Sequence, residues 1–222
     1  TRATNTATPR PPEMATKRDA KERDEAPPQT LLICCGALAR EVVALVREQG
    51  WERRLRVECL PAKLHMDPES IPEQVRQKIR AERDNYDDIL VFYGDCGTGG
   101  RLDDMLEEEG VERIEGAHCY EIYAGSSQFK EMMQNEPGSF FLSDFLARHF
   151  ERLVWQGLAL DRFPQLRDTY FGNYRKVVYL AQSEDSEMVD YARKAADMLG
   201  LEFEMRYTGI GGYRDFLEAR IA

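Results

Sequence analysis

The sequence predicts an α/β protein with a mostly parallel sheet covered by helices on both faces, a three-layer, Rossmann-like arrangement. Short apolar runs of strand length alternate along the chain with amphipathic helical patterns. Strands that are separated by helices are joined by crossovers and therefore pair in parallel. The first run, TLLICC at residues 30–35, is apolar throughout, which is typical of a strand buried on both faces.

The first half of the chain follows this alternation closely. Val42, Val43 and Val46 lie on one stripe of a helix that ends at Gly50. Ser70 and Glu73 have the spacing of a capping box at the start of another helix. The expected strands in this half are residues 30–35, 55–60, 89–93 and 111–119, and further helices are expected from residue 70 and at 101–110.

The second half is less regular. Residues 136–144, EPGSFFLSD, are expected to form a turn into an apolar helix at 143–158. That helix is apolar enough to be a core helix or the surface of a homodimer. A fifth strand at 176–182, a helix at 184–200 and a sixth strand at 201–209 complete the expected sheet.

The ends of the domain are indicated by composition. Residues 1–30 are rich in Pro, Thr, Ala and mixed charge and contain almost no large apolar side chains, so we expect a disordered leader. A chain of 222 residues suits one domain with such a tail. We therefore expect residues 31–222 to form a single α/β domain with a helical insertion near residues 126–172.

Charge and cysteine content exclude several classes of function. The net charge of −10 argues against binding to nucleic acid or to anionic membranes, because surfaces that bind phosphate backbones are usually basic. No apolar run approaches the roughly 20 residues of a membrane span. The five cysteines are an odd number in a mid-sized chain, which argues against a secreted disulfide framework. We expect free thiols in the reducing cytoplasm.

Cysteine and histidine residues follow four successive predicted strands. In open α/β sheets, ligands bind at the carboxyl ends of the strands. In chain order these residues are Cys34 and Cys35, His65, Cys96, and His118 with Cys119. Thiolate and imidazole are the ligands that zinc prefers. The predicted zinc ligands are Cys35, His65, Cys96, His118 and Cys119.

Alternatives remain for each of these residues. Adjacent residues of a strand point to opposite faces, so one of Cys34 and Cys35 is expected to reach the site. Whether His118 or Cys119 is the ligand stays open. Free cysteine is among the most buried residue types, so packing is the competing role. An iron–sulfur centre is less favoured because the set includes histidine.

The segment GDCGTGG at residues 94–100 is a glycine-rich turn between a strand and a helix. Backbone N–H groups at such a turn can bind the phosphate of a cofactor, with Gly94, Gly97 and Gly99 as the candidate residues. The segment lacks the Lys-Ser/Thr ending of a P-loop and does not match GxGxxG. The glycines would otherwise let the backbone approach a metal or substrate closely.

Several sequence blocks together resemble an uncharacterised family of unknown function. The blocks are CCGAL, LHMDPE, YGDCGTGG, GAHCYEIYAGS and EPGSFFLSD, over most of residues 31–150. Genes of that family often lie beside corrinoid-dependent methylamine or betaine methyltransferases. The resemblance implies a role in one-carbon metabolism, with a corrinoid protein or a methyltransferase subunit as the partner. The corrinoid-binding motif DxHxxG is absent from the sequence, so the chain itself is not expected to carry the corrinoid.

These observations predict a zinc-binding protein, and specifically a methyltransferase that acts with a corrinoid protein. Zinc bound by Cys and His can hold a thiol substrate as its thiolate, and Asp95 and Glu121 are candidate catalytic groups that handle protons. A site closed by four ligands leaves no room for substrate, so one ligand must exchange. The alternatives are a non-catalytic metal or cofactor carrier, an accessory protein of a methyltransferase system, and a protein that binds a phosphate-bearing cofactor.

Overall fold

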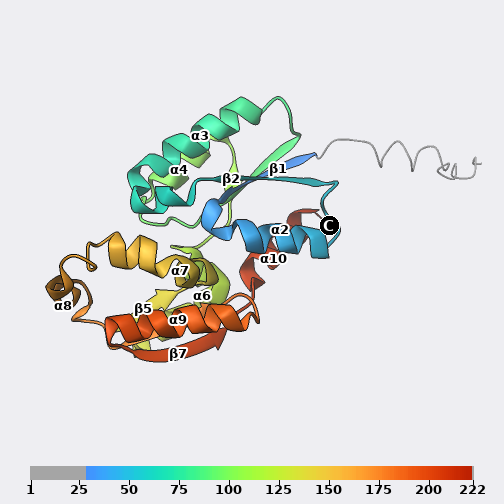
Figure 1. Cartoon of the computed structure of the whole chain (residues 1–222). Coiled ribbons are helices and arrows are strands. Elements are labelled where there is room, and N and C mark those ends of the chain that lie inside the picture. Colours follow the sequence, from blue (N-terminus) through green and yellow to red (C-terminus); the bar gives the residue numbers. More distant parts are fainter. Residues whose placement is uncertain (1–28, 222) are drawn as a thin grey trace, which may run out of the picture.

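The computed structural model describes residues 29–221, and residues 1–28, most of the leader expected from the sequence, lie outside this part. Within residues 29–221 the strands form two parallel sheets, each in its own lobe (Figure 1). The first sheet has the strand order β2-β1-β3-β4 and the second has the order β5-β6-β7. The predicted α/β class and the parallel pairing are confirmed, whereas the division into two sheets is not evident in the sequence.

The elements of the two lobes are as follows. The first lobe contains β1 (Thr30–Cys35), α2 (Ala39–Glu48), β2 (Leu55–Leu60), α3 (Ile71–Glu82), β3 (Asp88–Phe92), α4 (Arg101–Glu109), β4 (Glu112–Arg113), α5 (Cys119–Ala124) and α10 (Gly211–Ile221). The second lobe contains α6 (Ser126–Asn135), β5 (Ser139–Leu142), α7 (Asp144–Phe150), α8 (Arg167–Phe171), β6 (Lys176–Ala181), α9 (Ser186–Leu199) and β7 (Glu202–Tyr207). None of the helices in residues 29–221 combines the length and the apolar character needed to cross a membrane.

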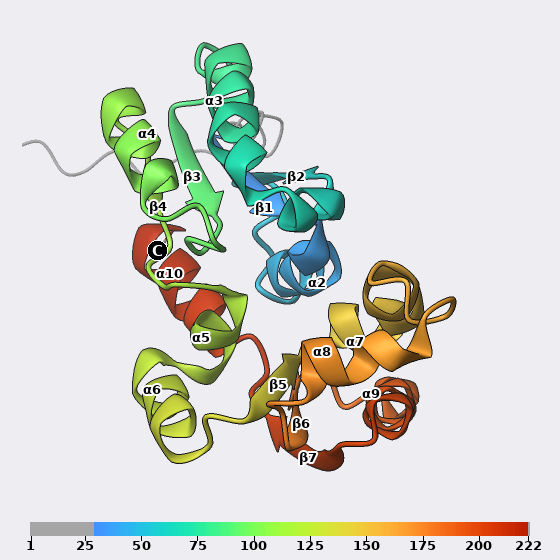
Figure 2. The same cartoon turned by 90° about the vertical axis from the view of Figure 1, so that its left-hand side faces the viewer.

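The first sheet is buried on both faces by helices. Leu32 and Phe92 pack on one face with residues of α2 and α10, and Leu31 and Ile33 pack on the other face with residues of α3 and α4. This alternation follows from the two-residue period of a strand. Figure 2 shows α10 beside α5 in the first lobe, although α10 follows β7 in the sequence. The chain therefore crosses between the lobes twice.

The second sheet has the same layered construction. Val177 and Tyr179 of β6 pack with residues of α7 and α9. Val178 and Leu180 point to the opposite face, where they pack with Phe129 of α6. The continuous apolar run of β6 thus reflects burial on both faces, as expected for a central parallel strand.

Three local expectations are wrong. Ser139–Leu142 form strand β5 instead of a turn. The sequence did not reveal this strand, because four residues are too few to show the two-residue period of a strand. Strand β4 comprises Glu112–Arg113 alone, so it is much shorter than the expected strand at 111–119. Ser70 makes no capping box, since its hydroxyl donates to the Asp67 carbonyl oxygen at 2.8 Å.

Candidate functional site

The loop that carries Cys96 is held against the loop that carries Cys119. The Cys96 amide donates to the Ala117 carbonyl oxygen at 2.7 Å. A Cβ atom at Gly94 would lie 2.8 Å from the Cα atom of His118, closer than real Cβ contacts allow. Glycine at position 94 therefore permits the backbone contact that brings the end of β3 and the start of α5 together.

The substitution Gly94→Ala should lower the free energy of unfolding by about 1–3 kcal/mol, because the added methyl group would meet backbone atoms that cannot turn aside. Urea denaturation measures this change. Gly211→Ala is the matched control, since a Cβ there meets no atom within 4 Å outside its own helix. Equal stability of the two variants would show that the close approach at Gly94 is not a constraint.

A second close approach brings the ends of β1 and β2 together. A Cβ atom at Gly36 would lie 2.7 Å from the Leu60 carbonyl oxygen, so only glycine fits there without movement. Cys35 ends β1 immediately before Gly36, and His65 lies in the 3-10 helix Ala62–Met66 that follows β2. The segments that carry Cys35 and His65 are therefore neighbours.

These loops surround a cavity of about 270 Å³, which we call the thiol cavity. Four of the five predicted zinc ligands line it: Cys35, His65, Cys96 and Cys119. The other lining residues are mostly apolar or aromatic and come from both lobes, among them Phe92, Tyr93, Tyr120, Phe140, Phe145, Leu153 and Tyr213. The structure thus brings together thiols and an imidazole from four separate segments in a largely apolar enclosure.

For each of the two open pairs in the predicted ligand set, one side chain lines the thiol cavity and the other does not. His118 does not line the thiol cavity; its ring packs against Phe129, with centroids 4.9 Å apart, and its buried Nδ1 has no partner within residues 29–221. Cys119 lines the cavity instead. Cys34 is fully buried in the core, with its Sγ 2.9 Å from Sγ of Cys59 on the adjacent strand. Cys35 is therefore the thiol of β1 that reaches the cavity.

The thiols of the cavity are held in their protonated form. Burial raises the pKa of Cys96 to about 11, with a contribution from Cys35, and burial also raises the pKa values of Cys35 and Cys119. His65 is exposed overall, but it lines the cavity. Burial of the imidazole and the nearby His118 lower the pKa of His65. The neutral form of His65, which is the form that binds a metal, is therefore favoured.

The donor set fits zinc chemically, but the side chains do not form a closed ligand shell. Across residues 29–221, no three His, Cys, Asp or Glu side chains stand in an arrangement that could hold a metal ion. Binding would require rotation of the cysteine side chains and loss of their protons.

The two carboxylates predicted to handle protons do not line the thiol cavity. Glu121 accepts a hydrogen bond from the Ala117 amide at 2.8 Å, at the start of α5. Asp95 accepts hydrogen bonds from its own loop; although burial opposes this, the bond from Thr98 and the bonds from two glycine amides lower the pKa of Asp95. In the structure, Asp95 stabilises the loop that contains Cys96, and Glu121 stabilises the start of the helix that begins at Cys119.

The glycine-rich turn has its amide donors directed at Asp95. The amides of Gly99 and Gly100 donate to this carboxylate at 3.1 and 2.9 Å. A phosphate bound at these amides would have to displace Asp95. Gly97 is exposed beside Pro68. Phosphate binding at Gly94, Gly97 and Gly99 therefore stays a prediction, because the Gly99 and Gly100 amides already have Asp95 as their acceptor.

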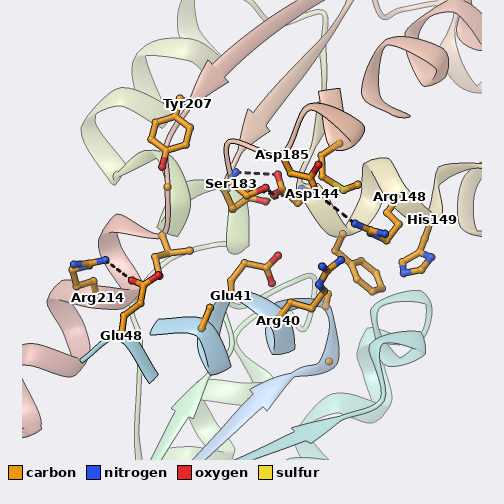
Figure 3. A pocket seen from close by; sticks show the side chains of 18 residues that line it. Arg40, Glu41, Glu48, Asp144, Arg148, His149, Ser183, Asp185, Tyr207 and Arg214 are labelled. Atoms are coloured by element: carbon orange, nitrogen blue, oxygen red, sulfur yellow. Dashed lines mark hydrogen bonds and ion pairs between the residues drawn. The ribbon is translucent and has the colours of Figure 1, made fainter. Parts of the chain in front are cut away.

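A second, larger cavity lies between the lobes. Its volume is about 610 Å³, and we call it the interlobe cleft (Figure 3). It is lined by residues that follow the ends of β1, β5, β6 and β7, chiefly Gly36, Ala37, Arg40, Glu41, Glu48, Asp144, Phe145, Arg148, His149, Gln182, Ser183, Asp185, Tyr207, Ile210 and Arg214. Ala37 and Phe145 line both the cleft and the thiol cavity, so the two cavities adjoin.

The charged residues of the interlobe cleft were missed in the sequence. Arg40 and Glu41 lie on a helix that looks amphipathic, and Arg148 lies on one that looks apolar, so each seemed an ordinary surface charge. The available signal was position: Asp144 and Ser183 come just after strand ends, where parallel sheets bind ligands.

The geometry defines a class of protein: an α/β protein with two parallel-sheet lobes, a thiol cavity and a charged cleft between the lobes. The family described as "Protein of unknown function (DUF1638)" matches residues 59–217. The chain therefore belongs to this family, which agrees with the resemblance seen in the sequence blocks. A search of curated proteins found no match.

Proposed function

We propose that this chain is a cytoplasmic zinc-binding protein of one-carbon metabolism whose metal site is the thiol cavity. Cys35, Cys96 and Cys119 are the proposed thiolate ligands and His65 the proposed imidazole ligand. The observation that carries the proposal is that these four side chains, from four separate segments, line one largely apolar cavity. Three thiols with an imidazole are a known zinc donor set, that of closed four-ligand sites.

The proposed reaction is methyl transfer to or from a corrinoid protein. The family resemblance supports this context, and the absence of a corrinoid-binding motif supports a separate corrinoid-bearing partner. Zinc in such a site would supply a thiolate nucleophile by lowering the pKa of a bound thiol. His65 is the exposed member of the set, so we propose that His65 leaves when a substrate thiol enters.

Metal analysis of protein purified without added zinc tests the site. We expect about one zinc per chain in the wild type and a large loss in Cys35→Ser and Cys119→Ser. Cys59→Ser is the matched control, because Cys59 is an exposed cysteine that does not line the cavity, and it should retain the metal. Equal zinc content in all these proteins would reject the proposed ligands.

Zinc affinity should rise with pH. Burial raises the pKa of Cys96 to about 11, so each thiol that becomes a ligand must release a proton to the solvent. Competition with a chromophoric chelator at several pH values measures this dependence. An affinity that did not change with pH would exclude thiolate ligation, whereas zinc binding without methyl transfer would favour the metal-carrier alternative.

A further inference from the structure

The interlobe cleft has the position and size of a small-molecule site. Its walls come from the carboxyl ends of strands in both parallel sheets, which is where such sheets bind ligands. Its volume of about 610 Å³ lies within the usual range for ligand pockets, roughly 300–1,000 Å³. The cleft is distinct from the thiol cavity, and the inference below does not rest on the proposed zinc site.

Asp144 shapes the floor of the cleft but is not free to bind a ligand. Its carboxylate accepts hydrogen bonds from the Tyr179 hydroxyl at 2.6 Å and from the backbone amide of Gln182 at 3.0 Å. It also accepts hydrogen bonds from the backbone amide and the hydroxyl of Ser183. These bonds use the available lone pairs of Asp144. The charge of Asp144 nevertheless remains close to Glu41.

Glu41 is the acidic group that is open to a ligand. Figure 3 shows its carboxylate pointing into the cleft, and its Oε2 is buried without a hydrogen-bond partner within residues 29–221. Burial raises the pKa of Glu41, and Asp144 adds to this effect. The Glu41 backbone amide, which hydrogen-bonds the carboxylate, and the charges of Arg40 and Arg148 act in the opposite direction. Buried carboxylate oxygens are normally paired, so Oε2 still lacks a hydrogen-donating partner.

Positive charge lies next to this acidic group. Arg40 is exposed, and its charge lies near enough to Glu41 to lower the pKa of that carboxyl group. Arg148 lies 3.8 Å from Asp185 and 3.8 Å from Glu187, which is beyond hydrogen-bond distance. Burial and the nearby Arg152, Arg148 and Arg40 lower the pKa of His149. The guanidinium donors of Arg40 and Arg148 are therefore available to an anionic group.

We infer that the interlobe cleft binds a small zwitterion, with its ammonium group on Glu41 and its carboxylate on Arg40 and Arg148. A ligand with only an anionic group would be repelled by Glu41 and Asp144. A ligand with only a cationic group would be repelled by the two arginines. A molecule that carries both charges gives a hydrogen-bond donor to Oε2 of Glu41 and an acceptor to the guanidinium groups of Arg40 and Arg148.

Isothermal titration calorimetry with the full chain tests this inference. The probes are glycine, 4-aminobutanoate and 6-aminohexanoate, which separate the two charges by increasing lengths, with butanoate and butylamine as single-charge controls. We expect at least one aminoalkanoate to bind in the millimolar range or better, and more tightly than either control. If no aminoalkanoate binds, or if a single-charge control binds as tightly, the inference is overturned.

Variants assign the two ends of the ligand. Glu41→Gln and Arg40→Gln should each weaken binding of the best aminoalkanoate by about 10-fold or more, because each removes a charge-assisted hydrogen bond. Glu48→Gln is the matched control: Glu48 lines the same cleft but pairs with Arg214 at 3.5 Å, so its binding should change by less than about 2-fold. Equal effects in all three variants would overturn the assignment.

A stability measurement separates binding from folding. Because the pKa of Glu41 is raised in the folded state, ionised Glu41 costs stability above the usual carboxyl pKa, and the cost vanishes at lower pH where Glu41 is protonated in both states. Glu41→Gln should therefore raise the melting temperature at neutral pH and leave it unchanged below the carboxyl range. A lower melting temperature at neutral pH would show that Glu41 has a partner within the protein, which removes the basis of the inference.

Discussion

Replacing Asp144 with alanine should lower the free energy of unfolding by about 3–5 kcal/mol. Asp144 is 5% exposed, and its carboxylate accepts hydrogen bonds from Tyr179, Gln182 and Ser183. Alanine would leave these donors without an acceptor, and each buried unpaired donor costs about 1–3 kcal/mol. The bonds join the start of α7 to the end of β6, so their loss should loosen the second lobe.

Urea denaturation followed by circular dichroism checks this result. For a chain of this size, 1 kcal/mol corresponds to about 2–4 °C in melting temperature. Asp185→Ala is the matched control, since Asp185 is exposed and accepts a hydrogen bond from the Glu187 amide at the start of α9; losing this cap should cost about 1 kcal/mol. If Asp144→Ala cost no more than Asp185→Ala, the buried carboxylate would not be joining α7 to β6.

Cys96→Gly should fold at least as stably as the wild type and yet bind zinc about 100-fold or more weakly. Cys96 has a backbone φ of 48°, in the left-handed region, where a non-glycine residue costs about 1–2 kcal/mol. Glycine removes that strain but also removes a proposed thiolate ligand. A residue held in a strained conformation points to a role at a site.

Two further variants separate the backbone effect from the thiol effect. Cys96→Ala keeps a Cβ atom, so it should melt within about 1 kcal/mol of the metal-free wild type and lose as much zinc affinity as Cys96→Gly. Ala159 also has a positive φ, of 58°, and lies outside the thiol cavity, so Ala159→Gly should gain stability and keep the zinc. Full zinc content in both Cys96 variants would show that the thiol is incidental.

The alternation of apolar runs and helical patterns predicted the α/β class correctly, because a buried strand such as β6 must be apolar on both faces. Strand pairing was not predictable. Nothing in the pattern of Ser139–Leu142 or of Lys176–Ala181 shows that these strands pair with each other instead of extending the first sheet. Pairing depends on where the crossover segments carry the chain, and hydrophobic period does not contain that information.

The sequence by itself determined that cysteine and histidine residues follow four successive predicted strands, and parallel strands place their carboxyl ends at one edge. Only the tertiary structure decided which of them face the same cavity. Cys35 rather than Cys34, and Cys119 rather than His118, line it, because neighbouring residues point in different directions and packing selects one. The interlobe cleft was decided entirely by folding, since Arg40, Glu41, Asp144 and Arg148 become neighbours only when the two lobes meet.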